Sequence, residues 1–210
     1  MRATPHSRPR PIACCRVLPH KGEDPAKDGG ILYLMKRELE ESLAAEFPFM
    51  RRGLTAEEQK ERWGGVRDLY SGWGLEMGSG WFQLIWDLCA EIRAAYEEAG
   101  ATVDIVVDQA KEKWGGLRFY WHPRGQKVAI HAFDCLGGPS FRAKPGSLPV
   151  HAKVDEIVRK YEEKSTRVCE RCGAPGVLRT DLGYVCTLCD EHHQECLERL
   201  RRPKEPEKSL

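Results

Sequence analysis

Two cysteine pairs with metal-ligand spacing lie close together near the C-terminus. Cys169 and Cys172 form one pair, and Cys186 and Cys189 form the other. Two thiolates at this spacing reach one ion, and Gly173 permits the tight backbone that turns amide groups toward the sulfurs. A disulfide framework would spread its cysteines along the chain, whereas most of the nine cysteines here are in the last quarter. The pattern therefore predicts a zinc ion bound in a reducing compartment.

Two ligand sets fit this spacing. The first is a four-cysteine ribbon made of Cys169, Cys172, Cys186 and Cys189. The second, which we prefer, consists of Cys169, Cys172, Cys189 and His192. A helix that begins just after Cys189 would turn His192 toward the ion, in the knuckle, hairpin, helix order of a treble clef. Cys186 stays open as the alternative fourth ligand. Either set closes the coordination shell to water, so the predicted Zn²⁺ is structural rather than catalytic.

The elements that position these ligands can be predicted from local patterns. Residues 177–187 have hairpin character with a turn at 181–183, and a helix is expected from just after Cys189 through Arg201. Asp190 is expected to cap that helix. We therefore expect a zinc-binding module over residues 165–202.

Upstream of the module, apolar periodicity predicts helices. Apolar residues recur every fourth position over 35–47, and Pro48 ends that segment. A capping-box pattern opens a short helix over 55–65. The strongest stripe covers 81–99 and includes Cys89, which is expected to be a core residue. Another amphipathic helix covers 150–161.

Strand patterns separate these helices. Residues 102–113 and 117–121 predict a hairpin that turns at 114–116, and 127–133 is expected to add a third strand. The fold class expected is α+β: a small antiparallel sheet with flanking amphipathic helices in residues 35–164, followed by the treble-clef or ribbon-like zinc module. Residues 1–34 are expected to be a disordered, dispensable basic leader, and 203–210 a disordered tail.

Bulk properties narrow the function classes. The formal net charge is +1, so the chain has no global attraction for nucleic acid or anionic membranes. No apolar run approaches the length that spans a bilayer, and the first residues lack the apolar core of a secretory signal. The protein is therefore expected to be cytoplasmic and without a membrane partner.

Two sequence blocks carry a family resemblance. They are WGLEMGSGWFQLI over residues 73–85 and VDQAKEKWGGLRFY over residues 107–120. Together they resemble a widespread family of small, uncharacterised bacterial, prophage and phage proteins that carry a C-terminal zinc motif. The resemblance covers roughly residues 60–195 and implies no established activity. It favours Cys189 with His192 as the last ligand pair. Ser79 stands where relatives have an Asp, which disfavours a catalytic acid at that position.

The function expected is that of a non-enzymatic binding or regulatory protein of a phage or mobile element. It would act through contacts with another protein, for instance as an inhibitor of a host system, and no catalytic residue is assigned. The alternative is nucleic-acid binding through basic and aromatic residues of the hairpin: Lys111, Lys113, Trp114, Arg118 and Tyr120. A zinc-containing nuclease that uses His192 or His193 is a less favoured alternative.

Overall fold

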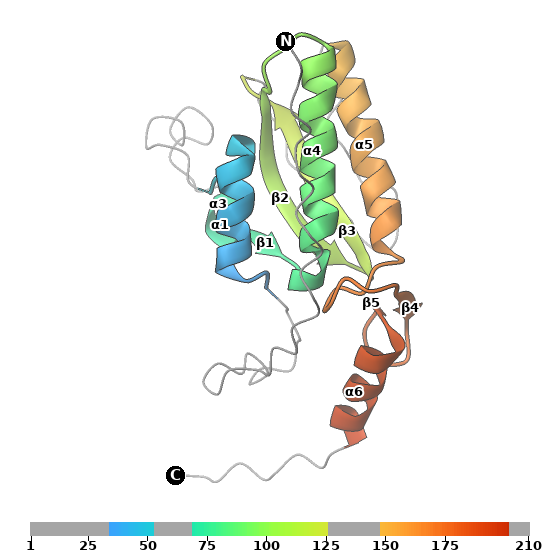
Figure 1. The fold of residues 1–210 in the computed structure, drawn as a ribbon. Coiled ribbons are helices and arrows are strands. Elements are labelled where there is room, and N and C mark those ends of the chain that lie inside the picture. The colour runs from blue at the N-terminus through green and yellow to red at the C-terminus, as the bar shows by residue number, and fades with distance from the viewer. Residues whose placement is uncertain (1–33, 53–68, 126–147, 202–210) are drawn as a thin grey trace, which may run out of the picture. The chain divides into compact units, whose positions relative to one another are not determined.

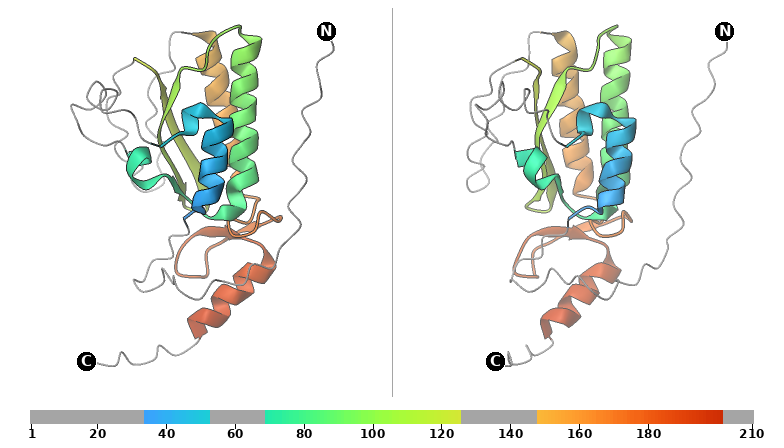
Figure 2. Two further views of the ribbon diagram at one scale, coloured as in Figure 1. Left: turned by 60° about the vertical axis from the view of Figure 1, so that its left-hand side comes forward. Right: turned by 90° about the vertical axis from the view of Figure 1, so that its left-hand side faces the viewer.

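Two long amphipathic helices and a hairpin form the main layers of the protein (Figure 1). The computed structural model describes residues 34–52, 69–125 and 148–201. Helices α4 (Phe82–Glu98) and α5 (Pro149–Ser165) lie side by side, and the same face of the β2–β3 hairpin packs against them (Figure 2). Both helices were predicted, because each has an apolar stripe long enough to identify its period.

The sheet is mixed rather than antiparallel. Strands β2 (Ile105–Lys113) and β3 (Gly116–Pro123) form the predicted antiparallel hairpin. A further strand, β1 (Leu75–Glu76), pairs with β2 in parallel. The prediction of a purely antiparallel sheet is therefore wrong. A strand of two residues is too short to carry an alternating pattern, so only its tertiary pairing identifies it.

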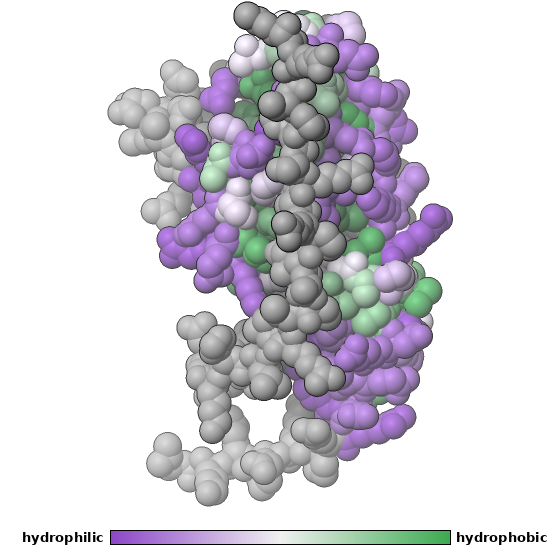
Figure 3. All heavy atoms as spheres, in the orientation of Figure 1, coloured by the Kyte–Doolittle hydropathy of each residue, from purple (hydrophilic) through white to green (hydrophobic). Residues whose placement is uncertain are grey.

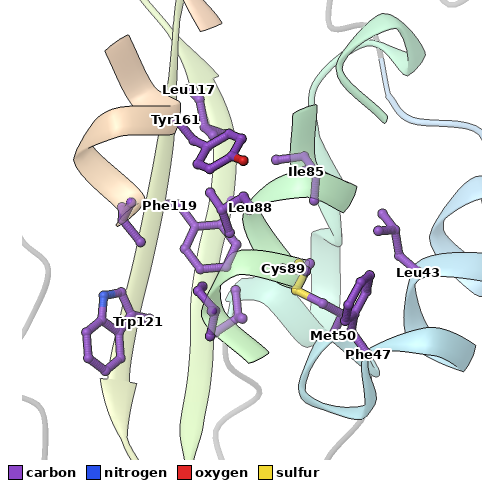
Figure 4. Packing of buried hydrophobic residues seen from close by; sticks show 14 of the residues in the cluster. Leu43, Phe47, Met50, Ile85, Leu88, Cys89, Leu117, Phe119, Trp121 and Tyr161 are labelled. Carbon is purple, nitrogen blue, oxygen red and sulfur yellow. The ribbon is translucent and has the colours of Figure 1, made fainter. Parts of the chain in front are cut away.

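The core lies between the hairpin and the helices (Figure 4). Helix α1 (Arg37–Glu46) and the 3-10 helix η2 (Pro48–Met50) close one side of it. Leu43 and Phe47 are fully buried, and the Phe47 ring meets Trp86 of α4 edge-on, with ring centroids 5.2 Å apart. Cys89 is also fully buried, as expected of a core residue, and burial raises the pKa of its thiol.

The C-terminal module contains a hairpin followed by a helix, in the predicted order. Strand β4 (Val177–Arg179) pairs antiparallel with β5 (Cys186–Leu188), and α6 (Asp190–Arg201) follows. Asp190 lies in the first turn of α6, and its carboxylate pairs with Arg179 of β4.

Short elements connect the longer helices and strands. Helix α3 (Leu69–Trp73) precedes β1, and the 3-10 helix η3 (Ser79–Trp81) leads into α4. The described part of the chain thus has five α-helices, and all of it belongs to one compact unit, Leu32–Leu210. The predicted helix over 55–65, the strand over 127–133, the leader and the tail lie outside the described residues. No helix in the described ranges is long and apolar enough to cross a membrane.

Candidate metal centre

The ligand atoms of Cys169, Cys172, Cys189 and His192 converge on one point. All four atoms lie within 4.8 Å of one another. The Cys172 and Cys189 sulfurs are 3.8 Å apart, and the Nδ1 atom of His192 lies 3.5 Å from the Cys169 sulfur and 3.1 Å from the Cys189 sulfur. These are the four residues of the preferred ligand set.

The three separations can be compared with those around a tetrahedral zinc ion. Zinc–sulfur bonds of about 2.3 Å and zinc–nitrogen bonds of about 2.0 Å place sulfurs about 3.8 Å apart and a sulfur and nitrogen about 3.5 Å apart. Two of the three separations match these values, and the third, Cys189 to His192, is 3.1 Å. A group of three cysteines and one histidine could therefore hold a metal ion, and such a donor set is consistent with zinc.

Protonation chemistry also favours a cation at this point. Desolvation, together with the neighbouring Cys169 and Cys189 sulfurs, raises the pKa of the Cys172 thiol to about 12. Deprotonation of Cys172 at neutral pH, which metal binding requires, would therefore need a compensating cation beside it. Desolvation and the nearby Arg171 guanidinium lower the pKa of His192, which keeps its imidazole neutral and able to bind a metal.

Cys186, the alternative fourth ligand, is not among the residues whose ligand atoms converge. Its side chain is buried in a small hydrophobic core with Cys169, Leu182, Leu188 and Cys196, and Cys189 packs against this core. Desolvation raises the pKa of the Cys186 thiol to about 12. Cys186 therefore packs as a small apolar residue in this structure, apart from the converging group.

His193 is engaged elsewhere. Its Nε2 atom lies 2.9 Å from the Asp181 carboxylate in the loop between β4 and β5. This hydrogen bond joins the hairpin to α6, so the adjacent histidines have separate structural tasks. The His192 side chain faces the cysteines, and the His193 side chain holds the hairpin.

The loop that carries Cys169 and Cys172, here called the metal knuckle, is hydrogen-bonded to the rest of the fold through its backbone and through the Glu170 side chain. The Gly80 amide donates to the Glu170 carbonyl at 2.8 Å, and the Gly78 amide donates to the Glu170 carboxylate at 2.8 Å. A Cβ atom on Gly80 would lie 2.5 Å from the Cys169 carbonyl oxygen and from the Cys172 amide nitrogen. The glycines before α4 thus permit direct backbone contact with the loop that carries two ligands.

Glu170 is the residue that sequence reasoning missed. It lies between the two knuckle cysteines and is only 5% exposed, which raises the pKa of its carboxyl group to about 7 through desolvation. Nothing in the sequence indicates that the glycine block before Trp81 and the zinc motif make contact.

Two further hydrogen bonds join the module to the elements around it. The indole nitrogen of Trp81 donates to the Val168 carbonyl at 2.8 Å. The Thr187 hydroxyl of β5 donates to the Gly115 carbonyl in the β2–β3 turn at 2.6 Å. The knuckle therefore contacts the start of α4, while β5 contacts the hairpin tip.

The residues of the predicted hairpin surface differ in exposure. Trp114 is 56% exposed, whereas Tyr120 is buried at 8%. Lys111 and Arg118 are cross-strand partners and half-buried, as is Lys113. Only one of the two aromatic side chains is therefore open to solvent.

No family model matches the chain, and searches of curated proteins and of solved structures gave no match.

Proposed function

We propose that this protein is a zinc-stabilised binding protein that acts through contacts with another protein rather than by catalysis. The observation that carries the proposal is the donor set: four protein ligands converge on one point and are backed by a knuckle that is bonded to the glycines before α4. A shell of four protein ligands leaves no position for substrate or reactive water, which is typical of metal ions that hold a fold together.

The class of partner follows from the resemblance. Proteins of phages and mobile elements act within a host cell, and a small regulatory protein of this kind would bind and inhibit a component of a host system. Near-neutral net charge supports a protein partner over nucleic acid, because it provides little non-specific attraction for phosphate.

Metal analysis tests the first half of the proposal. Purified protein is expected to contain about one zinc ion per chain. Cys172→Ser should lose the ion, whereas Cys186→Ala is the matched control and should retain it because its side chain lies in the small core. Absence of metal from the wild-type protein, or its loss only in Cys186→Ala, contradicts the proposed site.

The second half of the proposal, which is contact with another protein, needs a binding measurement. The metal-loaded protein is expected to crosslink to a discrete host protein, and the complex should persist at salt concentrations that release non-specific nucleic-acid binders. A salt-sensitive gel shift with DNA or RNA, without any protein complex, would instead favour the nucleic-acid alternative.

A further inference from the structure

The four candidate metal ligands differ in their access to solvent. Cys169 is fully buried, Cys189 and His192 are half-buried, and Cys172 is exposed. Cysteines buried in apolar surroundings are chemically inert, whereas a thiolate in contact with solvent can react. Among the four ligands, Cys172 is therefore the residue that a dissolved reagent reaches most directly.

A bound metal ion would keep Cys172 in its reactive form. A thiol that coordinates a metal is deprotonated, and the thiolate rather than the thiol is the nucleophile. Metal-bound Cys172 would thus combine the two properties that make a cysteine sensitive to oxidation, which are thiolate character and exposure. Cys89 lacks the second property, because it is fully buried in the core.

A second sulfur lies next to that of Cys172. The Cys172 and Cys189 sulfurs are 3.8 Å apart, so they need to approach by about 1.8 Å to form a disulfide bond. Rotation of the exposed Cys172 side chain can supply this movement, because exposed side chains change rotamer readily. Cys169 is a poorer partner. Its side chain is fully buried in the small core, and its amide donates to the Ala174 carbonyl at 2.7 Å.

The surroundings of Cys172 suit a small, uncharged oxidant. The guanidinium of the preceding residue, Arg171, donates to the Glu195 carboxylate at 2.8 Å, so these two opposite charges compensate each other. Figure 3 shows a hydrophilic surface over α6, the helix that carries His192. Hydrogen peroxide is polar and carries no charge, so it needs no charged binding site to reach an exposed sulfur.

We propose that the metal centre is a peroxide-sensitive site at which Cys172 is oxidised. The Cys172 thiolate attacks one oxygen of hydrogen peroxide, the O–O bond breaks, and hydroxide leaves as the sulfur becomes a sulfenic acid. The Cys189 thiolate then attacks the Cys172 sulfur and displaces a second hydroxide, which forms the disulfide. Two protons from solvent convert the hydroxides to water, and the peroxide takes up the two electrons. This inference rests on the zinc ion of the proposed function.

Oxidation would remove two of the four ligands, and the remaining two cannot complete a tetrahedral shell, so Zn²⁺ would leave. The loop that carries Cys172 also carries Glu170, whose carboxylate accepts a hydrogen bond from the Gly78 amide at 2.8 Å. Just before this loop, the Val168 carbonyl accepts a hydrogen bond from the Trp81 indole at 2.8 Å. Peroxide would therefore act on the start of α4 through the loss of the metal. Transient disulfides with such sensing roles are the kind found in reducing compartments.

Zinc release from the full-length, zinc-loaded protein tests the proposal. Hydrogen peroxide is expected to release about one zinc ion per chain to a chromogenic indicator. Peptide mapping should then find a disulfide between Cys172 and Cys189, and dithiothreitol followed by zinc should restore the metal-bound protein.

Cys172→His is the variant that isolates the exposed thiolate. Imidazole can replace a thiolate as a zinc ligand but forms no disulfide. This variant should keep its zinc and release it to peroxide at least about tenfold more slowly than the wild type, because the reactive sulfur is absent. Cys186→Ala is the matched control. It removes a buried cysteine outside the converging group, so it should release zinc as the wild type does.

The other outcomes separate this inference from the proposed function. Wild-type protein that contains zinc and retains it in peroxide overturns the oxidation site alone. A disulfide that does not join Cys172 to Cys189, or release from Cys172→His at the wild-type rate, overturns it as well. If Cys172→His binds no zinc, the disulfide mapped in the wild type decides by itself. Wild-type protein that binds no zinc under reducing conditions instead contradicts the proposed function, before any peroxide is added.

Discussion

At the residue scale, Gly80, just before α4, makes close backbone contact with the metal knuckle. A Cβ atom there would lie 2.5 Å from three backbone atoms of residues 169–172, and backbone in a ligand loop cannot move aside easily. We expect Gly80→Ala to lower the free energy of unfolding by about 2 kcal/mol or more, as overpacking does elsewhere. Urea denaturation measures this.

Gly72 provides the matched control. A Cβ atom at Gly72 has no neighbour within 4 Å, so Gly72→Ala should leave stability unchanged or raise it slightly. Equal effects of the two substitutions would show that the knuckle does not press on Gly80.

Trp114 and Gly115 form the two-residue turn between β2 and β3, with φ angles of 56° and 75°. The strain at Trp114 gives an expectation opposite to that for Gly80→Ala. Positive φ costs an ordinary residue about 1 kcal/mol relative to one that tolerates the left-handed region. Trp114→Asn creates the Asn-Gly pair that this turn type prefers, so it should raise the free energy of unfolding by about that amount. A fall in urea stability would contradict the strain argument.

Residue spacing identifies the candidate metal ligands, but it does not identify the hydrogen bonds that hold the ligand loop in place. Cys169 and Cys172 are neighbours in sequence, and His192 follows Cys189 by three residues, so local geometry alone brings each pair together. The Gly78–Glu170 hydrogen bond joins residues 92 apart, and the Thr187–Gly115 bond joins residues 72 apart. Contacts over such distances follow from packing, which no local pattern encodes.

At the element scale, α4 and α5 are joined by a polar bridge at their surface. The Glu91 carboxylate lies 2.6 Å from the Lys160 ammonium and accepts a hydrogen bond from the Tyr161 hydroxyl at 2.8 Å. Desolvation raises the pKa of Glu91, but these two partners together lower it below its ordinary 4.5. The ionised carboxylate thus stabilises the helix pair.

The direction of the pH dependence of stability follows from the lowered pKa of Glu91. A carboxyl group with a lowered pKa in the folded state contributes stability above its unfolded pKa and loses it as pH falls through the folded value. Glu91→Gln should therefore destabilise by less than about 1 kcal/mol near neutral pH, because the pair is partly exposed. The difference from wild type should vanish as pH falls below 4.5.

Urea denaturation across this pH range measures the difference. Glu198→Gln, at an exposed position of α6, is the control and should show no such trend. A difference that grows on acidification would contradict the bridge.

Long elements with a clear apolar period could be predicted from the sequence, whereas short ones could not. Helix α4 repeats its apolar residues over 17 residues, which identifies both its period and its buried face. Strand β1 has two residues, and its parallel pairing with β2 depends on the path of the chain between them. The mixed sheet therefore could not be inferred from alternation, whereas the hairpin could.

At the scale of the whole molecule, the metal centre and the core share hydrogen bonds. Glu170 bonds to the glycines before α4, Trp81 bonds to Val168, and Thr187 bonds to the hairpin turn. Without a bound metal, nothing would hold the knuckle sulfurs together. The loop that positions the buried Glu170 against Gly78 and Gly80 would then lose its conformation. Metal binding should therefore stabilise the entire described unit rather than the C-terminal module alone.

Removal of the metal with a chelator tests whether metal binding stabilises the entire described unit. We expect the metal-loaded protein to unfold in one transition, with the same midpoint by far-UV circular dichroism and by tryptophan fluorescence, which reports Trp81 at the junction. Removing the metal with a chelator should lower that common midpoint by roughly 10 °C or more, since structural zinc contributes several kcal/mol to folding. Cys172→Ser should behave as the chelated wild type does, and Cys186→Ala should keep its response to the chelator.

The alternative is that the core folds without the metal and that only the C-terminal module depends on metal binding. In that case the metal-free protein would retain the high-temperature transition unchanged and lose only the circular dichroism of α6 and the β4–β5 hairpin. The hydrogen bonds at Gly78, Gly80 and Trp81 argue against it, because they tie the first turn of α4 to the backbone around the ligands. Trp114 would share this dependence, since its turn is held by Thr187, two residues before a ligand.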